Sequence, residues 1–238
     1  MTSDMGGQPH DADLMAAVTE LGTALRQLVD ASVLTTVPAD QLRAAAADAQ
    51  AVTARLAASQ RPATQLPALD DPVVFRRVYS PVSGVGSALA PPVRIRRVEG
   101  GVVAEALLGP AYEGPPGYVH GGVSSLLMDQ LLGSAAIAAG LWGMTVHLEV
   151  DYRRPVPLST PLTMRAQVTE TAGRKCVVTG TIATAAAPDR TLVEARGVFV
   201  LPREELHADY FGTITDATGR HRPPARPTDA TALSDADA

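Results

Sequence analysis

The chain has 238 residues, of which 46% are hydrophobic and 19% are charged, a composition typical of a folded globular protein and not of a disordered chain. The formal net charge of −5 argues against a nucleic-acid or anionic-membrane partner, because phosphate groups require a basic surface. The single cysteine, Cys176, excludes an internal disulfide and a cysteine-based zinc site. The polar N-terminus lacks the basic-then-apolar pattern of an export signal, so we expect a cytoplasmic protein without a membrane span.

Residues 1–62 are predicted to form a helical extension. Apolar residues recur at three- and four-residue spacing between Leu14 and Val29, which indicates an amphipathic helix. The segment that begins at Val33 interrupts this pattern, and Pro38 favours the start of a second helix. Neither helix carries a group of chemically useful residues, so we expect both to serve packing or oligomer contacts.

The two regions that flank residues 98–202 lack the apolar periodicity of helices or strands. Residues 63–97 are predicted to be a proline-rich, extended lead-in with a short strand at 73–75, because proline removes backbone donors and disfavours a helix. Residues 203–238 are rich in Asp, Thr, Pro and Ala, which predicts a disordered tail. No repeat of fixed period is present.

Residues 98–202 carry the pattern of a single α+β domain. The expected elements, in order, are a strand at 102–108, a loop rich in glycine and proline at 109–117, a long helix at 121–140, and three or four strands within 145–201. A helix followed by an antiparallel meander is an α+β arrangement. Because this helix is apolar on nearly all sides, we expect the antiparallel sheet to wrap around it.

The apolar stretch from Val123 to Leu141 is almost long enough to cross a bilayer. Asp129 lies well inside it, and an unpaired charge at that depth costs about 3 kcal/mol. We therefore interpret the segment as a buried core helix.

Asp129 also suggests a site. At about 100° per residue, it falls on one stripe of the helix with small residues, namely Gly122, Ser125, Gly133 and Ala136. The first-turn amides of a helix lack intrahelical partners, and they lie about 10 Å from Asp129 along the axis. A carbonyl oxygen bound there would bring its carbon toward the carboxylate, as acyl transfer with an oxyanion hole requires. The alternative is structural, with Asp129 bonded to a backbone group or a strand hydroxyl.

The strand that follows the helix alternates cleanly between apolar and polar residues. This period of two places Val146 and Leu148 on one face and Thr145 and His147 on the other.

The loop and the helix start carry a family resemblance. Its motifs are the segment EGPPGYVHGG from Glu113, the aspartate nine residues after His120, Thr145 in the next strand, and the segment YRRP from Tyr152. Together they resemble the hotdog-fold acyl-coenzyme A thioesterases of the phenylacetate-pathway type (PaaI-like), with their mammalian acyl-CoA thioesterase relatives. Bacterial phenylacetate-type members usually carry an asparagine shortly before His-Gly-Gly. This chain lacks it, so the fatty-acyl-CoA branch is the better match.

The resemblance implies a hotdog fold and the hydrolysis of an acyl-CoA to a free acid and coenzyme A. It makes Asp129 the general base or the nucleophile. By the same resemblance, the Gly122 amide, together with Gly121, is expected to polarise the thioester carbonyl. Thr145 is expected to orient the water, and His120 to contact substrate or hold the loop. Hotdog sites are usually completed by a partner subunit, so a homodimer or tetramer is expected.

Coenzyme A carries phosphates, for which the candidate ligands are two basic pairs, Arg153 with Arg154 and Arg174 with Lys175. We expect no metal, because no His, Asp and Glu residues have metal-ligand spacing, and no cofactor beyond the coenzyme A part of the substrate. A hotdog hydratase or dehydratase and a non-catalytic acyl-CoA-binding module remain as alternatives.

Overall fold

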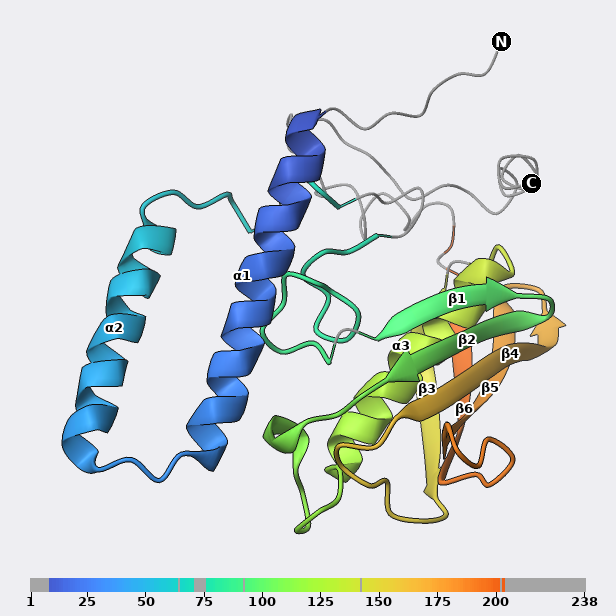
Figure 1. Ribbon diagram of the computed structural model, residues 1–238. Coiled ribbons are helices and arrows are strands. Elements are labelled where there is room, and N and C mark those ends of the chain that lie inside the picture. Colours follow the sequence, from blue (N-terminus) through green and yellow to red (C-terminus); the bar gives the residue numbers. More distant parts are fainter. Residues whose placement is uncertain are drawn as a thin grey trace.

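The computed structural model describes residues 9–63, 65–70, 76–91, 93–141, 143–201 and 203. Its centre is a six-stranded antiparallel sheet that wraps around one helix, α3, with a helical hairpin of α1 and α2 to one side (Figure 1). The helices are α1 (Pro9–Leu34), α2 (Ala39–Ala57) and α3 (Gly121–Ala138). The strands are β1 (Arg94–Val98), β2 (Gly101–Ala106), β3 (Met144–Tyr152), β4 (Leu162–Ala172), β5 (Lys175–Thr184) and β6 (Val193–Val200). The α+β class, the long central helix and the two N-terminal helices are as predicted.

The sheet has the strand order β1-β2-β4-β5-β6-β3. β3 follows the helix directly in sequence, yet it pairs with β6, the last strand, and forms one edge of the sheet. β1 forms the other edge. The β4–β5 turn contains Gly173 at a φ of +57°, a backbone conformation that favours glycine. α3 therefore lies in a curved sheet that has one edge at β1 and the other at β3.

The sheet begins at Arg94, four residues before the domain start expected at residue 98. Three of the five residues of β1 are arginines, so the strand lacks the apolar alternation by which the others were predicted. Pairing with β2 across the turn at Gly100, whose φ is +79°, defines it instead. The strand predicted at 73–75 and the tail from residue 204 lie outside the described residues.

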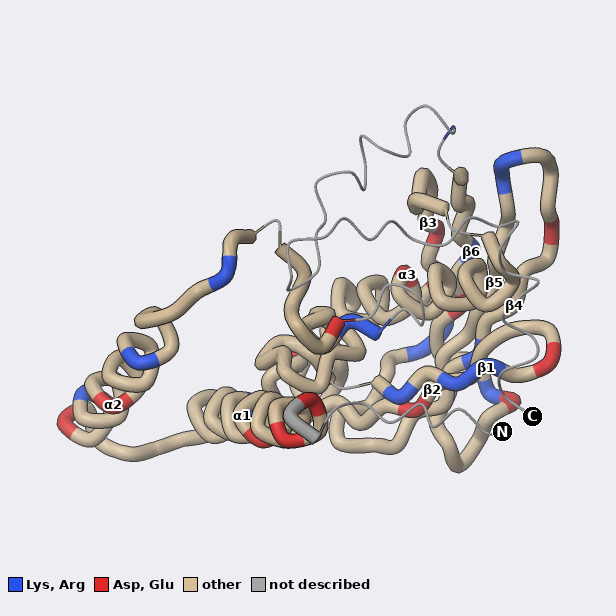
Figure 2. Tube along the Cα trace, turned by 90° about the horizontal axis from the view of Figure 1, so that it is seen from above, with Lys and Arg blue, Asp and Glu red and all other residues tan. Residues whose placement is uncertain are grey.

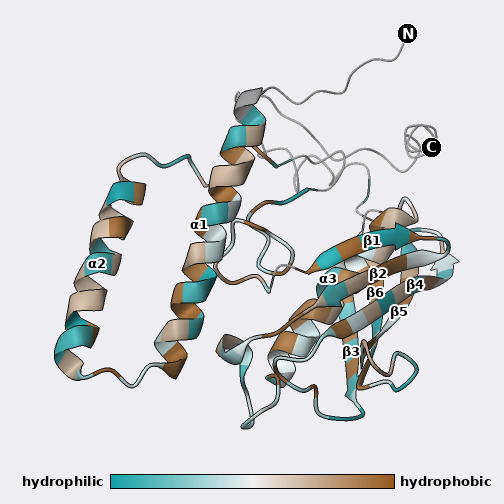
Figure 3. Ribbon diagram, in the orientation of Figure 1, coloured by the Kyte–Doolittle hydropathy of each residue, from teal (hydrophilic) through white to brown (hydrophobic). Residues whose placement is uncertain are grey.

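α3 is the centre of the core. Met128 and Leu132 are fully buried on it, and the helix is apolar along most of its length (Figure 3). α3 approaches β5 closely at Gly180. Only a residue without a side chain fits there, because a Cβ would lie 2.9 Å from side-chain atoms of both Met128 and Leu132. No helix in the described part of the chain is both long and apolar enough to pass through a bilayer.

α1 is held against the loop that precedes β1. Arg26 donates from Nη1 to the carbonyl oxygens of Val85 and Ser87, at 2.9 and 2.8 Å. Gly22 packs directly on the same loop, since a Cβ there would lie 2.2 Å from the Val85 oxygen. α2 buries none of its residues and extends away from the sheet (Figure 1).

Tyr112 ties this loop to the glycine-rich loop before α3. Its hydroxyl donates to the Leu89 carbonyl oxygen at 3.1 Å. Burial, and then the nearby Asp30 carboxylate, raise the pKa of Tyr112 to about 12. The tyrosine is therefore neutral and remains a hydrogen-bond donor throughout the physiological pH range.

Candidate functional site

The stripe of small residues on α3 faces the β3 edge of the sheet. Ser125 Oγ lies 2.6 Å from the Tyr152 hydroxyl, and Asp129 Oδ1 accepts a hydrogen bond from Thr145 Oγ1 at 3.0 Å. Further along the helix, a Cβ on Gly133 would lie 3.6 Å from the Phe199 ring of β6. The helical spacing thus correctly placed these residues on one face, and that face lies toward the two strands β3 and β6.

Asp129 is partly buried, and Thr145 keeps one of its carboxylate oxygens in place. Within the described part of the chain, no hydrogen bond or ion pair engages the second oxygen, Oδ2. One oxygen is therefore positioned by a strand hydroxyl while the other is available to accept a proton.

A β-bulge in β3 directs Thr145 toward the helix. The pairing with β6 shifts register between Thr145 and His147, and Val146 is the extra residue, with 60% of its surface exposed. Thr145 consequently pairs with the buried Phe199 and shares the inner face with Leu148. Strict alternation predicted that Thr145 and Leu148 lie on different faces of the strand. This prediction was wrong because the bulge inserts one residue between them.

The first turn of α3 is capped by the residue that precedes it. The ring Nδ1 of His120 accepts a hydrogen bond from the Gly122 amide at 3.0 Å. A nitrogen that accepts is unprotonated, so this contact requires the neutral ring with its proton on Nε2. The Gly122 amide, expected to be free, is therefore engaged, whereas the Gly121 amide makes no hydrogen bond to any described residue.

Tyr152 is a site residue to which the sequence analysis assigned no role. Its hydroxyl donates to the Gly121 carbonyl oxygen at 3.0 Å, next to its contact with Ser125. It lies on the inner face of β3, two residues beyond the partly buried Val150. The sequence pattern gave Tyr152 no role because it does not show that the start of α3 lies opposite this end of β3. Tyr152 joins the end of β3 to the first turn of α3.

The four basic candidates for the coenzyme A phosphates fall into two groups. Arg153 donates to Glu194 Oε2 at 3.0 Å and lies 3.3 Å from Asp151, and these carboxylates raise its pKa, the Glu194 hydrogen bond most strongly. Arg154 donates to the Thr191 carbonyl oxygen at 3.0 Å. Both follow Tyr152, near the start of α3.

The second basic pair lies at the opposite end of the sheet. Arg174 donates to the Leu201 carbonyl oxygen at 2.7 Å, and Lys175 pairs in register with Val200, whose other neighbour is Met144. At about 3.3 Å per residue along β3, the two pairs lie roughly 25 Å apart. One chain therefore does not gather all four into one phosphate site.

Two other kinds of chemistry find little support. Cys176 is only 1% exposed, and burial raises the pKa of its thiol, which disfavours a thiolate nucleophile. Within the residues that the structure describes, His, Cys, Asp and Glu side chains form no group of three or more that could hold a metal ion.

Comparison with known proteins identifies the family to which this part of the chain is similar. The family model described as "Thioesterase superfamily" matches residues 116–186, which include the helix start, Asp129 and Thr145. Among curated proteins, the chain is similar to acyl-coenzyme A thioesterase THEM4 of Mus musculus, with 35% identity over 89 residues, or 37% of each chain. The Xenopus laevis protein of the same name is 39% identical over 67 residues, 28% of this chain and 30% of that one. The chain thus spans about a third of the length of these curated relatives.

A solved structure extends the match to most of the chain. It is described as a thioesterase superfamily protein, is 36% identical, and has a TM-score of 0.69 over 77% of this chain and 94% of its own. The fold is therefore the hotdog fold that the motifs implied. The chain belongs to the thioesterase superfamily.

The Tyr152 contact predicts a measurable loss of stability. Replacing Tyr152 by Phe removes the hydroxyl that joins β3 to α3 and leaves the ring in place. We expect the free energy of unfolding, measured by urea titration, to fall by about 0.5 to 1 kcal/mol. Tyr118→Phe is the matched control, because the Tyr118 hydroxyl makes no hydrogen bond to a described residue. Equal unfolding free energies for the two variants would contradict the assigned contact.

Proposed function

We propose that this protein hydrolyses acyl-CoA thioesters to a free carboxylic acid and coenzyme A. The observation that carries the proposal is the Asp129 carboxylate, held by the Thr145 hydroxyl at 3.0 Å on the helix face that leads to the first turn of α3. Membership of the thioesterase superfamily and the similarity to proteins named acyl-coenzyme A thioesterase support this substrate class.

The proposed step uses the two carboxylate oxygens differently. Thr145 occupies Oδ1, and Oδ2 accepts a proton from a water molecule as the water oxygen attacks the thioester carbon. The lone pairs of the Thr145 hydroxyl oxygen remain available to accept a hydrogen bond from that water. When the carbon–sulfur bond breaks, the proton on Asp129 passes to the departing thiolate.

A nucleophilic role for Asp129 is the alternative within the same chemistry. Its oxygen would then attack the carbonyl carbon and form an acyl–enzyme anhydride, which water hydrolyses in a second step. Both routes need the same carboxylate and the same donors for the carbonyl oxygen.

The donors proposed for the carbonyl oxygen are the amides of Gly121 and Gly122. The Gly121 amide is without a described partner, and the Gly122 amide donates to the His120 ring. In this proposal the substrate carbonyl takes the place of His120 Nδ1, so that the ring caps the helix only while the site is empty. The exchange replaces a neutral acceptor by a developing oxyanion, which binds these donors more strongly.

The proposed assembly is a homodimer that pairs through β3. β1, at the other edge of the sheet, is protected from strand pairing by its three arginines, and Figure 2 shows the basic residues along it. β3 contains no lysine or arginine and exposes Val146 at 60% and Met144 at 47%. The apolar first half of this edge favours pairing with a second copy, and it lies beside the site, whereas the carboxylates Glu149 and Asp151 lie in the second half.

We expect the Asp129→Asn variant to lose at least 100-fold in kcat, because the amide cannot accept the proton. The measurement is release of free coenzyme A thiol from a panel of acyl-CoAs, with crotonyl-CoA hydration followed in parallel. Asp151→Asn is the matched control, since its carboxylate lies on the same strand as Thr145 but pairs with Arg153. Turnover of Asp129→Asn at the wild-type rate, binding of acyl-CoA without turnover, or hydration in place of hydrolysis would each contradict the proposal.

A pair of Thr145 variants tests how the carboxylate is held. Thr145→Ser keeps the hydroxyl and should retain most activity, whereas Thr145→Val keeps the shape, loses the hydrogen bond, and should be roughly tenfold slower. Equal rates for the serine and valine variants would remove Thr145 from the mechanism.

The dimer can be tested at its edge. We expect Val146→Glu to shift the protein from dimer to monomer in sedimentation velocity, because pairing through this edge would take a charged carboxylate of each copy out of water. Val98→Glu introduces the same charge on the opposite edge and should leave the dimer intact. A monomeric wild type, or dissociation by Val98→Glu alone, would contradict pairing through β3.

A further inference from the structure

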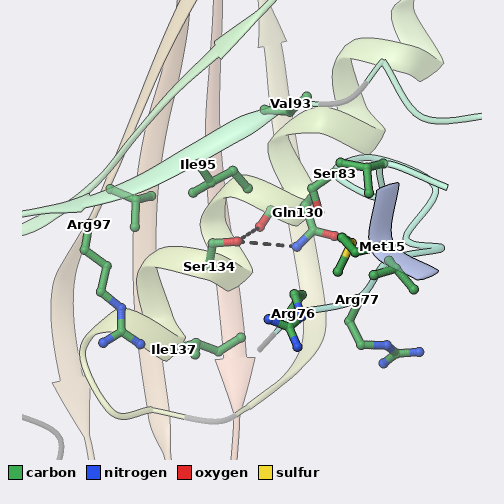
Figure 4. Close-up of a pocket in the computed structure, with 13 residues that line it drawn as sticks. Met15, Arg76, Arg77, Ser83, Val93, Ile95, Arg97, Gln130, Ser134 and Ile137 are labelled. Carbon is green, nitrogen blue, oxygen red and sulfur yellow. Dashed lines mark hydrogen bonds between the residues drawn. The ribbon is translucent and has the colours of Figure 1, made fainter. Parts of the chain in front are cut away.

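A second cavity lies on a different side of α3 from Asp129. It is open to solvent on one side, has a volume of about 370 Å³, and is bordered by α3, β1, the start of α1 and the loop before β1 (Figure 4). Gln130, Ser134 and Ile137 line it from the helix. Because consecutive residues on a helix are about 100° apart, Gln130 points away from the stripe that carries its neighbour Asp129. The cavity thus faces the β1 edge, and the proposed catalytic residues face the β3 edge.

The floor of this cavity is apolar. Val93 and Ile95 line it from the β1 side, Val102 from β2 and Ile137 from α3. Figure 4 shows the Ile95 and Ile137 side chains on the two elements that border the space. The volume falls within the range of small-molecule sites in proteins, about 300–1,000 Å³, which are mostly apolar with a few polar groups.

The rim, by contrast, is basic. Arg97 extends from β1 on one side, and Arg76 and Arg77 come from the loop on the other (Figure 4). Among the residues that the structure describes, no aspartate or glutamate lines the cavity, although the chain as a whole carries a net charge of −5. A local excess of guanidinium groups over an apolar floor is complementary to a molecule with an apolar body and one anionic head.

The three arginines differ in the ion pairs and hydrogen bonds that they already make. Arg77 is paired with the buried carboxylate of Asp70 at 2.8 Å, so its charge is neutralised. Arg76 donates from Nε to the neutral Leu69 carbonyl oxygen at 2.9 Å, and it forms no ion pair with a carboxylate in the described part of the chain. Arg97 makes no hydrogen bond or ion pair with any residue that the structure describes. Arg97 is therefore the guanidinium most available to a carboxylate.

The polar groups of the helix wall are also weakly held. Gln130 donates to Ser134 Oγ at 3.4 Å and accepts from Ser80 Oγ at 3.4 Å, both near the outer limit for a hydrogen bond. A ligand oxygen can take the place of Ser134 Oγ as the acceptor for Gln130 Nε2 at little cost.

We propose that this cavity is a second binding site, separate from the thioesterase centre, for an amphipathic carboxylate such as a medium-chain fatty acid. Arg97 binds the carboxylate, Arg76 supports it, and the apolar body lies on Ile95 and Ile137. The proposal does not depend on the assigned catalytic role of Asp129.

The test is isothermal titration calorimetry of octanoate into the full-length protein. We expect a single-site isotherm in the wild type that Arg97→Gln weakens at least tenfold, as the loss of a charge-assisted hydrogen bond implies. Arg97→Lys, which keeps the charge, should restore part of the affinity. Arg96→Gln is the matched control: it removes the same charge from the other face of the same strand, where Arg96 lies 3.6 Å from Glu105, and should leave the affinity within twofold.

Three further titrations distinguish this site from a purely apolar pocket, from a general anion site and from the catalytic groove. Octan-1-ol should bind at least tenfold more weakly than octanoate, inorganic phosphate should not compete, and Asp129→Asn should bind octanoate as the wild type does. The proposal is overturned if octanoate does not bind at millimolar concentration, if Arg97→Gln leaves its affinity unchanged, or if octanol or phosphate binds equally well. Loss of binding in Asp129→Asn but not in Arg97→Gln would overturn it too, because octanoate would then occupy the catalytic groove.

Discussion

The site depends on one constraint, which is that a carboxylate must remain accessible on a helix that otherwise serves as the core of the domain. Burying an unpaired carboxylate is costly, and the chain meets that cost with a single hydroxyl, Thr145, 3.0 Å from Asp129. The small neighbours of Asp129 on the helix keep that face open. The bulge at Val146 is what brings Thr145 to the inner face of β3. A regular strand would present Val146 at this position, and Asp129 would lack its hydrogen bond.

The same helix separates two environments. Its β3 side carries Asp129 and the capped first turn, next to an exposed edge strand, and its β1 side carries the arginine-rimmed cavity behind the N-terminal extension. The two edges of the sheet also differ in their content of basic residues. β1 has three arginines and is unsuited to pairing with another strand, while β3 has none. This distribution of charge is the basis for proposing self-association at the β3 edge and anion binding at the β1 edge.

Much of this could be predicted from the sequence, because the signals were local. Helical spacing placed Ser125 and Asp129 on one face, and the His-Gly-Gly segment marked the helix start. The parts that were missed depend on pairing between distant segments. β1 is defined by its register with β2 and not by its own arginine-rich composition. The bulge at Val146 is visible only against β6, and the cap on Gly122 requires the rotamer of His120. Likewise, charge alone offered four coenzyme A ligands, and the fold places them in two groups at opposite ends of the sheet.

In the proposed mechanism the thioester carbonyl displaces the His120 cap and lies between the first turn of α3 and residue 129. The most direct measurement is a crystal structure of Asp129→Asn with a non-hydrolysable acyl-CoA analogue, in which a methylene group separates the carbonyl from the sulfur. We expect the carbonyl oxygen about 3 Å from the amides of Gly121 and Gly122, the His120 ring turned away, and the carbonyl carbon facing residue 129. An analogue bound with its carbonyl elsewhere, while His120 still caps Gly122, would contradict the mechanism.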